Sequence, residues 1–383
     1  FDVMALSTLC EQCLKDFASS ALYNSNASST FAPRDGAAVE VFHFGSGKIE
    51  AKQGMDTVQF GGGGSSVKAE AMPFWQIVSH MMPFWASKHD DSFSAIVGLC
   101  LPKQVPQALS FDFASRDTLL ERLGVERFGL CLQASQGADG WLTVGLPAEE
   151  AEKSGFRRIP VTAEDHWAAE LAAPRVGDQP ISGACNSGCM AMVDSGSSLV
   201  LVPPPVMQAL NAAMANTPHS TSDCGDVSGL PTLVFELGGE QFELPPEDYM
   251  VEDTRWGPFM SSCRPAVAAV NRRTAGGAAV WSLGLPFLRR HYTIFDRAER
   301  ALHIASAGEP CTVSVDSAPA PAPRQQGGAP PLPPPSATSV ALRAPLVSAS
   351  VVKVSRTRRP VHVDWRAARL PAWATGDAGP LHI

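Results

Sequence analysis

The sequence predicts a mainly β protein made of two similar halves. Short runs in which apolar and polar residues alternate, such as residues 39–44, recur between glycine-containing turns and are typical of strands. A segment of the first half, residues 92–99, resembles residues 281–285 of the second half, because each places an apolar residue before a Gly-Leu pair. This internal repeat favours two homologous lobes over one large domain.

The most informative stretch is the apolar run at residues 191–202, which one carboxylate and a small-residue turn interrupt. Residues 191–193 and 199–202 are expected to be buried strands, and residues 195–197 a sharp turn. Asp194 would then lie at the tip of a buried hairpin, where a desolvated carboxylate is costly unless hydrogen bonds or a partner compensate. The alternative is an ordinary turn residue that bonds its own backbone.

Further motifs accompany Asp194. Cys185 and Cys189 enclose a short loop just upstream, and Trp281-Ser-Leu-Gly lies far downstream, followed by Phe295-Asp-Arg-Ala. This ordered set resembles the C-terminal lobe of the pepsin-like aspartic proteases, peptidase family A1. The resemblance extends over residues 1 to about 306.

The resemblance implies a bilobal pepsin-like double β-barrel in which each lobe contributes one aspartate to a central cleft. The lobes are expected at residues 1–154 and 155–308, with the boundary near Ser154 in a charged connector. Residues 309–383 are rich in proline, alanine and serine. Such a segment buries too little apolar area to offset its ordering entropy, so we expect a disordered tail.

In the first lobe, Asp2 is the best match to a catalytic aspartate. Relatives carry Asp-Thr-Gly-Ser-Ser and then Leu-Trp-Val-Pro-Ser, whereas here residues 3–7 follow Asp2 directly. The glycine of the missing turn permits a close backbone approach, and the turn's amides and hydroxyls orient the carboxylate. The chain begins with Phe1 rather than Met, which indicates a processed, clipped or incomplete N-terminus.

The resemblance implies an aspartic endopeptidase with Asp194 and Asp2 as its catalytic acids. Two nearby carboxylates cannot both ionise cheaply, so they share a proton, and one activates water while the other polarises the peptide carbonyl. Ser195, Gly196 and Ser197 form the supporting turn: Gly196 allows close approach of the lobes, and Ser197 supports the outer oxygen of Asp194. The substrate is a peptide or protein, and the scheme requires no cofactor and no metal.

Two other functions compete with this one. The alternative is a catalytically impaired or inactive homologue, or a truncated gene model, that binds peptides without cleaving them. A serine hydrolase is excluded because the chain has no Gly-x-Ser-x-Gly motif.

The flap over the bound peptide is expected at residues 39–49. This segment alternates and then turns on two glycines, which predicts a β-hairpin. By position, Phe44, Gly45 and Ser46 form the flap tip and contact substrate, and Phe44 stands where relatives usually have Tyr. The alternative for Phe44 is a plain cross-strand aromatic. Further along, residues 203–214 are expected to form a helix and residues 230–244 a hairpin that turns on Gly238 and Gly239.

Nine cysteines argue for an oxidising compartment. The resemblance implies three disulfides, Cys10/Cys13, Cys185/Cys189 and Cys224/Cys263. We therefore expect a secreted protein or one in the endomembrane, vacuolar or lysosomal lumen. Cys100, Cys131 and Cys311 remain, and the first two are expected to be buried small hydrophobes.

Charge and hydropathy exclude other partners. The net charge of −8 and the pI near 5.6 do not favour nucleic acid, which requires a basic face. No apolar run reaches the length of a membrane-spanning helix. We therefore expect no membrane span and a monomer.

Overall fold

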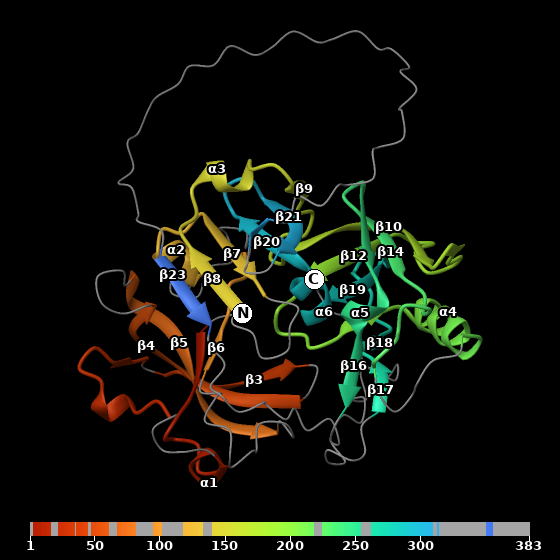
Figure 1. Cartoon of the computed structure of the whole chain (residues 1–383). Helices are drawn as coiled ribbons and strands as arrows, with labels where there is room; N and C mark the ends of the chain where they lie inside the picture. Colours follow the sequence, from red (N-terminus) through yellow and green to blue (C-terminus); the bar gives the residue numbers. More distant parts are fainter. Residues whose placement is uncertain are drawn as a thin grey trace.

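The computed structural model describes residues 3–16, 22–34, 36–44, 47–60, 67–81, 95–101, 118–132, 140–217, 224–253, 262–308, 312–313 and 350–354. These residues form three large β-sheets and one two-stranded sheet, and the helices between them are short (Figure 1). The predicted mainly β fold class is therefore confirmed. The helices are α1 Cys13–Asp16, the 3-10 helix Ser25–Ala27, α2 Leu119–Arg122, α3 Ala148–Ala151, α4 Pro204–Ala215, α5 Pro246–Tyr249 and α6 Leu285–Arg290.

The first sheet has six strands and is built from the first hundred residues, in the order β2-β4-β5-β1-β6, with β3 paired to β4. Its core contains Met4, Leu6, Ile49 and Trp75, which are buried on one face. The hairpin predicted around residues 39–49 is confirmed, since Phe44 pairs with Gly47. The strands are β1 Val3–Leu6, β2 Ala32–Pro33, β3 Val39–Phe44, β4 Gly47–Phe60, β5 Val67–Met81 and β6 Ala95–Val97.

The second sheet has eight strands, in the order β15-β14-β10-β12-β19-β13-β18, with β11 paired to β10. Helix α4 begins after Pro203 and confirms the predicted helix. The β14/β15 hairpin is also confirmed, and its turn residues Gly238 and Gly239 have φ of 54° and 88°, which glycine adopts without strain. The strands are β10 Ala168–Val176, β11 Gln179–Pro180, β12 Cys189–Val193, β13 Val200–Val202, β14 Leu233–Leu237, β15 Glu240–Leu244, β18 Val267–Ala269 and β19 Ala279–Leu283; β16 Met250–Asp253 and β17 Ser262–Pro265 form the two-stranded sheet.

The third sheet joins strands from both sides of the predicted boundary at residue 154, in the order β22-β21-β20-β7-β8-β23, with β9 paired to β21. At its centre the rings of Phe128 and Phe295 stack with centroids 4.6 Å apart. Strand β7 of the first half pairs with β20 of the second half, and β8 pairs with the other side of β7. The strands are β7 Arg127–Cys131, β8 Gly140–Val144, β9 Arg157–Pro160, β20 His291–Asp296, β21 Ala301–Gly308, β22 Thr312–Val313 and β23 Ser350–Val354.

Two of these strands, β22 and β23, come from the segment expected to be a disordered tail. Strand β23 pairs with β8 at the edge of the third sheet (Figure 1). The proline-rich composition did not predict either strand, and the other residues beyond Gly308 lie outside the described residues.

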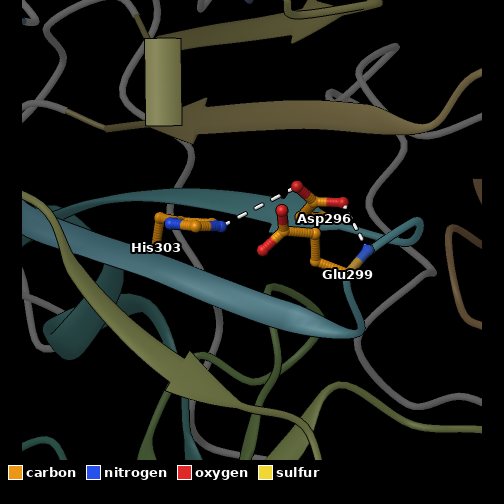
Figure 2. A group of neighbouring side chains, drawn as sticks. All are labelled: Asp296, Glu299 and His303. Carbon is orange, nitrogen blue, oxygen red and sulfur yellow. Dashed lines mark hydrogen bonds and ion pairs between the residues drawn. The ribbon is translucent and has the colours of Figure 1, made fainter. Parts of the chain in front are cut away.

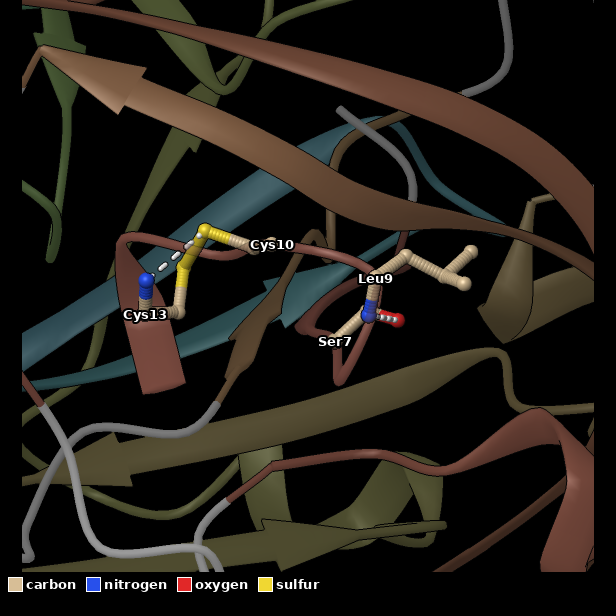
Figure 3. The surroundings of a disulfide bond; sticks show 4 residues. All are labelled: Ser7, Leu9, Cys10 and Cys13. Carbon is tan, nitrogen blue, oxygen red and sulfur yellow. Dashed lines mark hydrogen bonds between the residues drawn. A yellow bond between two sulfur atoms is a disulfide. The ribbon is translucent and has the colours of Figure 1, made fainter. Parts of the chain in front are cut away.

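The three predicted disulfides are present: Cys10–Cys13, Cys185–Cys189 and Cys224–Cys263. At the first, the Cys13 amide donates to Cys10 Sγ at 3.1 Å, and the Leu9 amide donates to the Ser7 hydroxyl (Figure 3). These bonds fit an oxidising compartment.

The remaining cysteines differ from the expectation. Cys131 is buried as predicted, but it is also disulfide-bonded. Cys100 is a free thiol and only half-buried. Alternating apolar residues around Cys131 indicated burial, but they carry no information on its partner.

The longest helix that the structure describes, α4, has 12 residues. A helix that crosses a bilayer needs roughly 20. None of the described helices therefore reaches across a membrane.

Candidate active site

Asp194 lies between two strands that do not pair with each other. Strand β12 runs parallel to β19 on one side, and β13 runs antiparallel to β19 on the other. The predicted hairpin is therefore wrong: β19 occupies the space between the two strands that the Asp194 turn connects. Local periodicity showed two apolar strands and a turn, but it could not show that a third strand, some eighty residues later, would separate them.

The turn holds the carboxylate with backbone groups. The Gly196 amide donates to Asp194 Oδ1 at 2.9 Å, and the Ser197 amide donates to the Asp194 carbonyl at 3.2 Å. The Asp194 amide donates to the carbonyl of Leu283 on β19 at 3.1 Å. The side chain is half-buried, while Ser195 and Gly196 are exposed. The local turn bond that we weighed as the ordinary alternative is present, and β19 additionally anchors the backbone.

Gly284 supports the turn from behind. It follows β19 directly and caps α6. A Cβ at this position would overlap the carbonyl oxygens of Ser197 and Leu199. The next amide, of Leu285, donates to the Ser197 carbonyl at 2.9 Å. Only glycine allows this approach, so the Trp281-Ser-Leu-Gly motif acts as the base of the Asp194 turn.

The hydroxyl next to Asp194 is that of Ser282, not that of Ser197. Ser282 is buried on β19, and its Oγ lies 3.4 Å from Asp194 Oδ2. The hydroxyl of Ser197, expected to support this oxygen, instead donates to the Leu199 carbonyl at 2.8 Å, because the turn directs it toward its own backbone. Sequence reasoning missed Ser282. The signal was a hydroxyl in the otherwise apolar strand Ala279–Leu283.

The first half repeats this arrangement of strands. Strand β1 lies between β5, which is parallel to it, and β6, which is antiparallel; β13 lies in the same way between β18 and β19. Val3 pairs with Val97, the residue before Gly98, as Val200 pairs with Leu283, the residue before Gly284. Strand β1 is therefore the counterpart of β13, the strand that follows the Asp194 turn.

The two acids differ in their separation along the sequence from the strand that follows them. Asp194 precedes Val200 by six residues, whereas Asp2 precedes Val3 by one, a difference of five residues. Asp2 itself lies outside the described residues.

The family profile described as "Asp: Eukaryotic aspartyl protease" matches residues 2–307. The chain belongs to the eukaryotic aspartyl protease family. The predicted resemblance and the bilobal pepsin-like fold class are thereby confirmed.

Individual family members match parts of the chain. Gastricsin of Mus musculus is 31% identical over 183 residues, which is 46% of this chain and 45% of gastricsin. Cathepsin D of Homo sapiens is 29% identical over 301 residues, 74% of this chain and 70% of cathepsin D. Chymosin of Callithrix jacchus is 27% identical over 220 residues, 56% of this chain and 54% of chymosin. The match therefore spans less than half the length of gastricsin.

The predicted flap of this aspartyl protease homologue is described up to its tip. Phe44 packs with Phe42 against the core that contains Trp75, and the rings of Phe42 and Trp75 meet edge to face with centroids 4.8 Å apart. The side chain of Phe44 is therefore partly buried against this core, and its contact with substrate stays a prediction. Gly45 and Ser46 lie outside the described residues.

A second acidic cluster lies in the third sheet and consists of Asp296, Glu299 and His303 (Figure 2). His303 Nε2 lies 3.8 Å from Asp296 Oδ2, and the Glu299 amide donates to Asp296 Oδ1 at 2.9 Å. Two arginines neutralise the acids: Arg127 Nε lies 2.5 Å from Asp296, and Arg158 Nε lies 3.1 Å from Glu299.

This cluster is an ion-pair network rather than a metal site. A cation would have to displace both guanidinium groups or lie beside them, at an electrostatic cost. The pKa of His303 is lowered, first by burial, against the opposing charge of Asp296. The network connects β7, β9, β20 and β21, and so ties the two halves of the chain together.

Proposed function

We propose that this chain is an aspartic endopeptidase that hydrolyses peptide bonds at the Asp194 turn. The observation that carries the proposal is the support of Asp194 by the Gly196 amide, by the Ser282 hydroxyl and, from behind, by Gly284. A carboxylate held by fixed donors is pre-oriented and keeps an oxygen available for a water molecule or a substrate carbonyl. Family membership supports the same reaction class.

The proposed mechanism uses two acids that share one proton. Asp194 supplies one, and Asp2 is proposed to supply the other from the first lobe. One carboxylate removes a proton from water as the water attacks the peptide carbonyl, and the other, protonated, donates to the carbonyl oxygen. As the C–N bond breaks, the proton taken from water passes to the nitrogen of the leaving amine, and the proton given to the carbonyl oxygen returns to the acid that donated it. No cofactor takes part in this scheme.

The short connection from Asp2 to β1 predicts a slow enzyme. In the second half, five residues of turn separate Asp194 from the strand that follows, and they provide the amide that bonds the carboxylate. The sequence has no such turn between Asp2 and Val3, so we expect Asp2 to have fewer orienting donors than Asp194. A misplaced catalytic group costs roughly 100-fold in rate when the displacement is about 1 Å.

The test is hydrolysis of denatured protein at acidic pH by the purified full chain. We expect slow cleavage that pepstatin inhibits and that Asp194→Asn abolishes. The matched control is Asp178→Asn, which changes an exposed acid in the turn between β10 and β11 and should leave cleavage unchanged. Cleavage that survives Asp194→Asn would rule out Asp194 as the catalytic acid.

The second candidate function is peptide binding without cleavage. The connection from Asp2 to β1 is five residues shorter than the connection from Asp194 to β13. This difference favours peptide binding without cleavage, because one of the two acids has no turn after it in the sequence. Calorimetric titration with pepstatin distinguishes the two functions: binding without detectable hydrolysis identifies a non-catalytic homologue, whereas binding with hydrolysis supports the enzyme.

We propose a secreted or endomembrane location, vacuolar or lysosomal lumen included, for a monomer that acts on peptides or proteins. The three disulfides support the oxidising compartment. The lobes at residues 1–154 and 155–308 are proposed on the repeated strand arrangement around β1 and β13. Size-exclusion chromatography with light scattering tests the monomer.

A further inference from the structure

One charged residue near Asp194 has no part in the scheme above. Arg272 lies in the segment after β18 that returns along β19. The Val280 amide donates to the Arg272 carbonyl at 3.0 Å, and Arg273 forms an antiparallel bridge with Ala279. Arg272 is therefore the cross-strand neighbour of Val280 on β19.

This register sets the direction of the Arg272 side chain. Neighbours across an antiparallel pair project from the same face, and residues two apart on a strand also share a face. Arg272, Val280 and Ser282 consequently share a face of the sheet. Ser282 contacts Asp194, and two residues along a strand span about 7 Å, which a long side chain covers.

The electrostatics agree with this placement. Arg272 is half-buried, and burial lowers the pKa of its guanidinium while the charge of Asp194 opposes that effect. The two groups thus interact through their charges across the Ser282 face.

Few other charges face this position from the elements around it that the structure describes. Strands β12, β13, β18 and β19 carry no ionisable side chain except the disulfide-bonded Cys189. Helix α6, which begins behind the turn, carries Arg289 and Arg290 in its last turn, and Arg290 is paired with Asp248 at 2.8 Å.

We propose that Arg272 is a positioning residue for Asp194, whose guanidinium orients the carboxylate on the face shared with Ser282. The inference rests on the proposed function for its role in catalysis, but the charge pair itself does not depend on activity. A cation on the same face of the sheet attracts the carboxylate and limits the directions in which it can turn.

The first test measures kcat and KM separately for the full chain and three variants. In Arg272→Gln we expect kcat to fall by roughly 10-fold to 100-fold with little change in KM, since a misplaced catalytic group slows the reaction without weakening the binding of the rest of the substrate. Arg272→Lys should retain most of the original kcat. The control is Arg273→Gln: Arg273 is exposed and donates to the Gly277 carbonyl at 2.9 Å. An unchanged kcat in Arg272→Gln, or an equal loss in Arg273→Gln, overturns the proposal.

The second test works without catalysis. Urea unfolding at pH 6.5 of the wild type, Asp194→Asn, Arg272→Gln and the double variant forms a thermodynamic cycle. We expect non-additive effects, with a coupling of roughly 2-fold to 100-fold in the unfolding equilibrium constant. Additive effects overturn the Arg272 proposal. Coupling in a chain that shows no hydrolysis supports Arg272 and refutes only the proposed enzyme.

Discussion

Gly284 lies directly behind Ser197, so close that a methyl group on Gly284 would overlap the Ser197 carbonyl oxygen. The two residues are 87 positions apart in the sequence, yet the Leu285 amide donates to that same carbonyl at 2.9 Å. The shape of the Asp194 turn therefore depends on the end of β19 as much as on the turn's own residues.

Gly284→Ala should displace the turn. We expect the free energy of unfolding to fall by about 1–3 kcal/mol, the usual cost of overpacking. Any peptidase activity should fall more strongly than the stability does. The control is Gly276→Ala, because the nearest atom to a Cβ there is Thr274 Oγ1 at 3.8 Å. Thermal and urea unfolding measure both variants, and equal stability of the two would contradict the close approach.

An inserted turn should restore the first acid. We predict that Ser-Gly-Ser-Ser-Leu, copied from residues 195–199 and placed between Asp2 and Val3, raises kcat/KM by roughly 100-fold, because it supplies the missing amide donors. Five inserted alanines serve as the control of equal length. If the gain persists after Asp2→Asn in the inserted chain, Asp2 is not the second acid.

His291 should make the fold sensitive to acid. Its ring is buried between Phe287 and Phe242, with Nδ1 2.9 Å from the Phe287 carbonyl. Burial, reinforced by the charges of Arg290 and Arg157, lowers its pKa to about 3.

The sign of this effect follows from proton binding. Between pH 6.5 and about 3 the unfolded chain binds the proton and the folded chain does not, so stability falls with falling pH by up to about 1.4 kcal/mol per unit from this group. We expect the free energy of unfolding of His291→Phe, measured with urea, to depend less on pH between pH 6.5 and 4 than that of the wild type. An identical slope in wild type and variant would show that His291 does not contribute.

Tyr23 should stabilise the first lobe through Asp56. The phenol donates to Asp56 Oδ2 at 2.5 Å, and Asp56 also accepts from the Thr30 hydroxyl and the Thr57 amide. Burial raises the pKa of Asp56, but these hydrogen bonds outweigh it and leave the pKa below the ordinary value.

Tyr23→Phe should cost about 1–3 kcal/mol, because it leaves a buried carboxylate short of one donor. The stability that Asp56 contributes is present above the pKa that this carboxyl has in the unfolded chain, and it is lost as the pH falls through the pKa in the folded chain. Without the Tyr23 hydroxyl the folded-state pKa is higher, so the variant should lose this stability at a higher pH. Tyr292→Phe is the control, since no hydrogen bond of its hydroxyl is seen among the described residues. Denaturant unfolding at pH 7 and pH 4 checks both; equal losses would contradict the specific role of Tyr23.

Peptide mapping without reduction should find Cys131 joined to Cys311. Of nine cysteines, three pairs account for six, Cys100 is a free thiol, and Cys131 is disulfide-bonded, which leaves Cys311 by elimination. Mass spectrometry of the unreduced digest tests this pairing, and a Cys131 peptide joined to Cys100 would contradict it.

The sequence predicted local features well and non-local ones poorly. Glycines marked the β14/β15 and β3/β4 turns, and alternation marked their strands, because hairpins are set by neighbouring residues. The position of β19 between β12 and β13 depends on residues about eighty positions away, and no local pattern encodes it.

The same distinction applies to the site. The Asp194 turn was recognisable from its small residues. Only the sheet register shows that the hydroxyl next to Asp194 is that of Ser282 and not that of Ser197. Arg272 likewise shares a face of the sheet with Ser282 only through its pairing with β19.

Strand β7 pairs with β20, which is synthesised much later. Arg127 and Asp296, which pair across β7 and β20, are separated by 169 residues. A nascent chain on the ribosome therefore carries β7 with an open edge while most of the second half is still being translated. Such high contact order slows folding and leaves the unpaired edge prone to aggregation, so we expect this protein to depend on chaperones during synthesis.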